Sequence, residues 1–277
     1  MTTIYKEVKK VYLWSTQVRP KLPPYLCFTS NTAGSTVQLN KQGSPTAVTL
    51  ETSTDGETRT TYTIGNTITL SNIWDKVYFR NTSETTTGFS TSTSAYYYFT
   101  LTWSINASWD VTSLVNKNCT TTLSWNYCFY ELFFNGSANT VLKTPPKLPA
   151  TTLTNRCYYL MFQNCAWLTT VPELPSTTLT TFCYHSMFRS CTNLEQLPKL
   201  PATTLATYCY NSMFYLCNKI KLSTTQTWEY QTEYRIPITW TWTTANYALA
   251  SMFTSTWWTF TWTPDINTTY YTSNTLV

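Results

Sequence analysis

Glycine, histidine and charge are scarce in this chain of 277 residues. It has 6 glycines and 1 histidine, and 11% of its residues are charged. No apolar run approaches the roughly 18 residues of a membrane helix. The net charge of +5 is scattered along the chain and forms no basic cluster. We therefore expect neither a membrane span nor a nucleic-acid partner.

Sequence motifs of catalysis and metal binding are also missing. The chain has no P-loop, no GxGxxG, no GxSxG and no paired carboxylate motif. One histidine and the lack of a CxxC pair argue against zinc. His185 occupies a position that differs between repeats, so we expect it to face solvent. We predict no catalytic residue, no metal and no cofactor, although a glycosidase-type carboxylate pair needs no local motif.

The first residues do not form a secretory signal. MTTIYKEVKKVYLW lacks the apolar core of such a signal. Export by another route, a truncated start and assembly inside a cell all remain open. Within the lead segment 1–21, Val11, Leu13 and Val18 predict a strand, a turn and a second strand. The stretch KVYLWSTQVRP resembles the openings of phage tail-associated and related bacterial surface proteins.

Residues 22–116 predict an all-β domain, a small sandwich of short strands. Hairpin turns are expected at Asp55-Gly56 and Gly65-Asn66, between alternating runs. Further strands are expected at 76–81 and 96–103. The tyrosines 96–98 either fill the core with alternate members or form an aromatic binding platform.

A repeat dominates the second half of the chain. Cysteines recur at 157, 183 and 209 and again at 165, 191 and 217, and Met-Phe pairs begin at 161, 187 and 213. Each step is 26 residues. Such self-similarity predicts a solenoid, in which each unit buries its apolar face against its neighbours.

Each unit combines two apolar patterns. Cys183, Met187 and Cys191 follow the i, i+4, i+8 spacing of a short helix. Leucines at 194, 197 and 200 then form an extended run interrupted by prolines. One helix and one strand in about 26 residues fall in the leucine-rich-repeat range. We therefore predict an α/β leucine-rich-repeat solenoid over 117–277, with an imperfect first unit at Cys128 and a degenerate C-terminal cap.

The units resemble the BspA-like leucine-rich repeats of bacterial surface proteins, through CYxxMFxxC and LPxLPATTL, over about 128–260. The resemblance implies a curved solenoid that binds proteins or surfaces and is not an enzyme. The expected function is recognition or adhesion at the cell surface or outside the cell, toward a protein or glycan. The alternatives are a phage tail-associated receptor-binding or virion structural protein and, third, a glycan-active enzyme.

The candidate binding face lies on the extended runs. Residues that flank the buried leucines there must point outward, and they vary between units. Trp167 is a candidate aromatic anchor. The candidate residues are Lys143, Thr144, Lys147, Trp167, Thr169, Thr170, Glu173, Glu195, Gln196 and Lys199. An ordinary solvated face is the alternative.

The nine cysteines allow three interpretations. Two cysteines eight residues apart in one helix would lie about 12 Å apart, beyond the roughly 7 Å limit for a disulfide. Cysteines of neighbouring units can approach each other. Buried free thiols, bridges between units and a metal site remain open.

Tryptophan is abundant where glycine is expected. The chain has 12 tryptophans against 6 glycines, although average glycine usage is about 7%. Turn positions hold Trp14, Trp74, Trp109, Trp125, Trp240, Trp242, Trp257, Trp258 and Trp262, and related segments, as the resemblance implies, carry glycine there. We hypothesise that many of these are UGA codons read as glycine in the source organism, with Trp167 a true tryptophan. Trp240, Trp242, Trp257 and Trp258 should then be exposed or have φ values that suit glycine. The alternative is an aromatic-rich binding surface.

Overall fold

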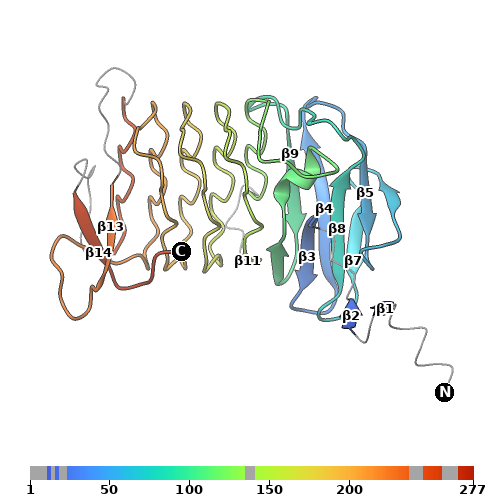
Figure 1. The fold of residues 1–277 in the computed structure, drawn as a ribbon, viewed down its shortest axis with the longest axis horizontal. Coiled ribbons are helices and arrows are strands. Elements are labelled where there is room, and N and C mark those ends of the chain that lie inside the picture. The colour runs from blue at the N-terminus through green and yellow to red at the C-terminus, as the bar shows by residue number, and fades with distance from the viewer. Residues whose placement is uncertain (1–10, 14–15, 19–23, 135–140, 237–245, 258–267) are drawn as a thin grey trace.

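The computed structural model describes residues 11–13, 16–18, 24–134, 141–236, 246–257 and 268–277. Figure 1 shows two sheets at the N-terminal end of the molecule, followed by a row of stacked loops that ends in a third, smaller sheet. A hairpin near the N-terminus projects from the sheets. One hydrophobic core runs through the described sheets and loops, without a break at the predicted boundary between residues 116 and 117.

The strands are short, and the described residues contain one 3₁₀ helix and no α-helix. The elements are β1 (Val11–Leu13), β2 (Thr16–Val18), β3 (Leu26–Ser30), β4 (Ser35–Gln42), β5 (Leu50–Ser53), β6 (Thr60–Tyr62), β7 (Thr67–Leu70), β8 (Lys76–Asn81), β9 (Tyr96–Leu101), β10 (Ile105–Ser108), η1 (Val111–Leu114), β11 (Leu142–Thr144), β12 (Leu222–Ser223), β13 (Thr232–Arg235) and β14 (Thr269–Thr272).

Two sheets pack face to face in the N-terminal part. One has the strand order β11-β10-β3-β8-β5-β6 and the other the order β7-β4-β9. Inward residues alternate with outward ones, as β4 shows with its alternating buried and half-buried side chains. Phe28 and Phe79 of the first sheet meet Phe99 of the second, with ring centroids 4.7 and 5.4 Å apart. These aromatic contacts form the centre of the domain.

Most of the predicted strands are present. β1 pairs with β2 as the expected hairpin, and the turn at Asp55-Gly56 joins the antiparallel strands β5 and β6. The hairpin predicted at Gly65-Asn66 is wrong, because this turn leads from β6 in one sheet to β7 in the other. Tyr97 fills the core at 2% exposure, whereas Tyr96 and Tyr98 lie half-buried on the other face of β9.

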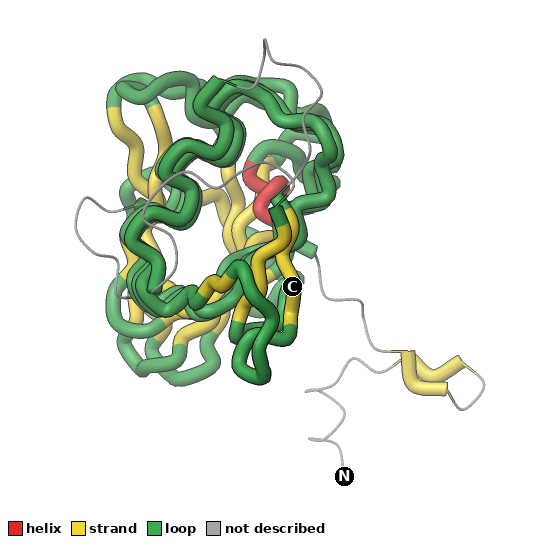
Figure 2. The backbone as a smooth tube through the Cα atoms, turned by 90° about the vertical axis from the view of Figure 1, so that its left-hand side faces the viewer, coloured by secondary structure: helices red, strands yellow, loops and turns green. Residues whose placement is uncertain are grey.

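The repeats form stacked rungs. We define rung 1 as residues 128–156, rung 2 as 157–182, rung 3 as 183–208, and rung 4 as the unit that begins at Cys209. The N–H groups of Tyr158, Leu160 and Phe162 donate to the carbonyls of Cys183, His185 and Met187 on the next rung, at 3.1, 3.1 and 3.0 Å. The same bonds recur between rungs 3 and 4. Viewed along the stack, successive rungs lie over one another (Figure 2).

The predicted α/β leucine-rich-repeat solenoid is wrong, because the segments expected to be helices are chains of tight turns. From the last residue of rung 1 into rung 2, every fourth residue has a left-handed backbone: Arg156, Leu160 and Asn164 have φ of 57°, 59° and 62°. Each turn closes with a bond such as Met161 N–H to the Tyr158 carbonyl, at 3.3 Å. In a chain of four-residue turns, the residues i, i+4 and i+8 all point inward, as they do on one face of a short helix. Over nine residues this period is indistinguishable from the 3.6 of a helix.

Identical side chains form ladders inside the stack. The phenylalanines at 133, 162, 188, 214 and 253 are stacked, with neighbouring centroids 5.2 to 5.7 Å apart. The tyrosines at 158, 184 and 210 stack in the same way at 5.8 and 5.9 Å. Because each ring rests on the equivalent ring of its neighbours, the stack derives its stability mainly from contacts between adjacent rungs.

The C-terminal end of the stack is covered by the sheet β12-β14-β13. Tyr234 of β13 and Tyr270 of β14 pack on Phe253, with centroids 6.0 and 6.3 Å apart. Beyond β14, residues 274–277 return to rung 3, as Figure 1 shows near the label C.

Candidate functional site

The extended runs of rungs 1 to 3 lie side by side on one face of the stack. They cover residues 142–149, 168–175 and 194–201, and Trp167, directly before the second run, adjoins them. Leu142, Leu168 and Leu194 occupy equivalent positions and are fully buried. β11 of rung 1 pairs in parallel with β10, so the face begins as a continuation of the large sheet. We call this surface the run face.

The structure places all ten candidate residues on the run face. Lys147, Trp167, Thr169, Glu173, Glu195 and Lys199 are exposed, and Lys143, Thr144, Thr170 and Gln196 are half-buried. At the same position of successive rungs, Lys147, Glu173 and Lys199 present alternating charge. Glu195 lies 3.6 Å from Lys219 of rung 4. The runs therefore form one surface whose side chains differ from rung to rung.

Trp167 forms the aromatic part of the run face. Its side chain is 43% exposed, and the Lys143 ammonium lies 5.0 Å from its ring centroid. Lys143, Thr169 and Asn193 border a shallow hollow of about 250 Å³ beside the indole. The Asn193 amide donates to the Ala166 carbonyl at 2.7 Å and is thereby held in place. An aromatic surface next to a cation and hydroxyl groups suits a polar ligand with an apolar side.

A second hollow, of about 350 Å³, separates the runs of rungs 1 and 2. Prolines dominate its lining, together with Leu148 and Val171, while Lys147 and Glu173 stand on its border. Its lining prolines are Pro145, Pro146, Pro149, Pro172 and Pro175. Val277 also lines it. We call this cavity the proline hollow.

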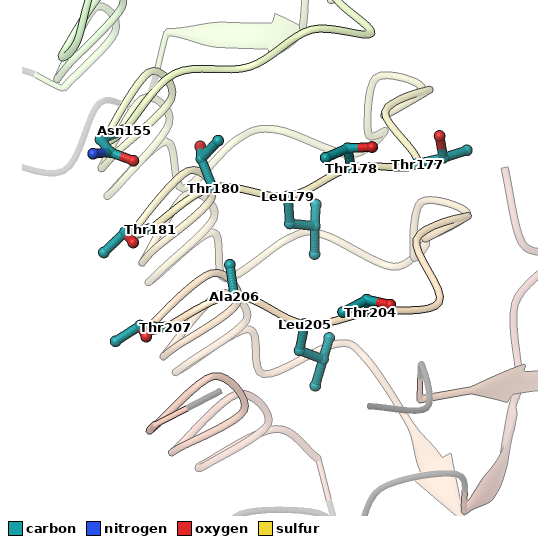
Figure 3. A pocket seen from close by; sticks show the side chains of 10 residues that line it. All are labelled: Asn155, Thr177, Thr178, Leu179, Thr180, Thr181, Thr204, Leu205, Ala206 and Thr207. Atoms are coloured by element: carbon teal, nitrogen blue, oxygen red, sulfur yellow. The ribbon is translucent and has the colours of Figure 1, made fainter. Parts of the chain in front are cut away.

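A third hollow lies elsewhere, among the threonine-rich loops that follow the runs. It has a volume of about 510 Å³ and is lined mainly by threonines of residues 177–181 and 204–207 (Figure 3). Thr180 is engaged, because its hydroxyl donates to the Thr154 carbonyl at 2.8 Å. The repeated TTL motif is the only sequence signal for this hollow. No candidate residue predicted from the sequence lines it, and it holds no charged side chain.

His185 is not the solvent-facing residue that the sequence predicts. It lies half-buried between Tyr159 and Phe182, with ring centroids 4.9 and 5.3 Å away. Burial, together with the charges of Arg189 and Arg156, lowers the pKa of His185 to about 4. At neutral pH the imidazole is uncharged and packs as an aromatic side chain.

The cysteines are free thiols, which confirms the first of the three interpretations. Eight of the nine are buried, and Cys119 is half-buried. The Cys191 and Cys217 thiols lie 3.1 and 3.0 Å from the carbonyls of Phe162 and Phe188 on the preceding rung. Burial raises the pKa of these thiols well above the ordinary value. They serve as small core residues.

Neither a metal site nor a membrane helix is seen in the described part of the chain. No three His, Cys, Asp or Glu side chains gather there as metal ligands. No helix in that part has the length and apolar character needed to cross a membrane.

Comparison of the chain with family models, with curated proteins and with solved structures returned no match.

Proposed function

We propose that this chain is a non-enzymatic recognition or adhesion protein that binds a protein or glycan on a cell surface through the run face. The resemblance of its repeats to BspA-like surface proteins supports the proposal. It also supports a location at the cell surface or outside the cell.

The observation that carries the proposal is the contrast between core and surface in the runs. Buried positions stay apolar from rung to rung, as Leu142, Leu168 and Leu194 do, whereas the exposed position of Lys147 changes to Glu173 and then to Lys199. The exposed indole of Trp167 lies on the same surface, beside Lys143. A rigid stack that presents varied polar groups and one aromatic anchor suits binding to a surface ligand.

A triple charge reversal tests this proposal. Lys147→Glu, Glu173→Lys and Lys199→Glu together change the net charge from +5 to +3, as does the single control Lys41→Glu on β4. We expect the triple variant to lose at least about tenfold in adhesion to host-cell or glycan surfaces, at an unchanged melting temperature. The control should adhere like the parent protein. Equal adhesion of the triple variant and its parent would remove the run face as the binding site.

A further inference from the structure

Residues 274–277 add to the edge of rung 3. The Val277 N–H donates to the Leu197 carbonyl at 3.1 Å, and the Lys199 N–H donates to the Val277 carbonyl at 2.8 Å. This pattern is that of a parallel strand pair. The Asn274 amide donates to the Glu195 carbonyl at 2.6 Å, in the same direction along the run. The segment thus lies parallel to the run of rung 3 and bonds to its backbone.

The equivalent edge of rung 2 is open. One repeat earlier, Val171 and Glu173 stand where Leu197 and Lys199 stand in rung 3. Among the described residues, nothing bonds to the Val171 carbonyl or to the Glu173 N–H. Rung 1 is paired at this position, because the Lys147 N–H donates to the Trp109 carbonyl at 2.7 Å. Among the described residues, rung 2 is thus the one of the three runs in which both this N–H and this carbonyl lack a partner.

The proline hollow lies next to this free edge. Its prolines have no N–H to donate, so they interrupt the backbone ladder between rungs 1 and 2. Its walls are mainly apolar, and Pro146, Pro172 and Val171 are buried residues at its surface. Val277, which pairs with rung 3, borders the same hollow. The hollow therefore combines an apolar lining with one free backbone donor and one free acceptor.

We propose that the proline hollow binds an extended peptide segment of a partner protein, which pairs in parallel with residues 171–173. The segment pairs with rung 2 as residues 274–277 pair with rung 3, and it places an aliphatic side chain against the prolines of the hollow. Hydrogen bonds to the Glu173 N–H and to the Val171 carbonyl fix the register of the peptide along the run. The apolar contact determines which peptide side chains are accepted. This inference rests on the proposed function of the run face and names peptide as its ligand.

A synthetic peptide of residues 272–277, TSNTLV, serves as the probe. We expect saturable binding to the full-length protein by fluorescence anisotropy and slower hydrogen exchange at the Glu173 amide. Replacing the last valine by aspartate should weaken binding at least about tenfold, because the apolar contact is lost. If the peptide slows hydrogen exchange at the Lys199 amide but not at the Glu173 amide, it has replaced the chain's own residues 274–277 on rung 3. That result would overturn the inference.

Two further substitutions test the backbone bonds. Glu173→Pro removes the N–H, and Glu173→Ala keeps it, so the proline variant should bind at least about tenfold more weakly than the alanine variant. A peptide with an N-methyl group on its last valine lacks the donor to Val171. It should lose about tenfold as well, without any change in the protein's folding. Equal affinities for the methylated and plain peptides would overturn the inference. Adhesion to surfaces is measured separately, so it can persist where peptide binding fails.

Discussion

Tryptophan occupies backbone conformations that suit glycine, and replacing it there should stabilise the protein. Between residues 24 and 126, left-handed φ values occur at four glycines, at Cys119 and at three tryptophans. Trp74, Trp103 and Trp109 have φ of 73°, 61° and 62°. Trp74 and Trp103 are 69% and 66% exposed, so their rings add little to the core. Of the four positions predicted from the sequence to show this behaviour, only Trp257 is described; it is 45% exposed and has no left-handed φ.

The expected gain follows from two opposing effects. A side chain in the left-handed region costs about 1–2 kcal/mol. Glycine costs about 0.5–1 kcal/mol through the greater freedom of the unfolded chain. Trp103→Gly and Trp74→Gly should therefore each stabilise by about 0.5–1 kcal/mol. At Trp109 the gain should be offset, because its ring faces the Lys147 ammonium at 5.5 Å, a contact worth about 0.5–1 kcal/mol.

Thermal melts and urea unfolding would measure this effect. We expect the melting temperature to rise by about 1–4 °C for Trp103→Gly. The control is Trp228→Gly, at a position that is 86% exposed and lacks a left-handed φ, and it should be destabilised. If both variants shift in the same direction, the reasoning is refuted. We also expect UGA codons at Trp74, Trp103 and Trp109 in the gene; UGG codons there would refute the recoding hypothesis and leave the conformational prediction standing.

Two other predictions concern the stack. Phe188→Ala should lower the free energy of unfolding in urea by about 3–5 kcal/mol, because it interrupts the phenylalanine ladder between Phe162 and Phe214. The control Thr203→Ala, at an exposed position, should lower it by less than about 0.5 kcal/mol. Comparable losses in the two variants would contradict a stabilising role of the ladder. The lowered pKa of His185 means that the unfolded chain takes up a proton before the folded one, so stability is full above about pH 6.5 and falls toward about pH 4. His185→Phe should melt like the parent at pH 7 and lose less at pH 4.5, and superimposable pH profiles of the two melting temperatures would contradict this.

The sequence by itself determined the register of the stack and the residues of its core. Because each unit packs on its neighbours, the 26-residue repeat placed Cys157, Met161 and Phe162 inside, and the structure buries all three. It also indicated the strands of the N-terminal sheets, whose alternating pattern is local. The candidate residues of the run face follow from the same repeat, since positions that flank buried leucines must point outward.

Only the tertiary structure decided the backbone of the repeats and the free edge of rung 2. The sequence pattern at Cys183, Met187 and Cys191 fits a helix and a chain of four-residue turns equally, and bonds to the next rung select the turns. Those bonds hold Leu160 and Ser186 in left-handed conformations that no local propensity favours. The return of Val277 to rung 3 joins segments about 80 residues apart, so no local pattern could indicate it.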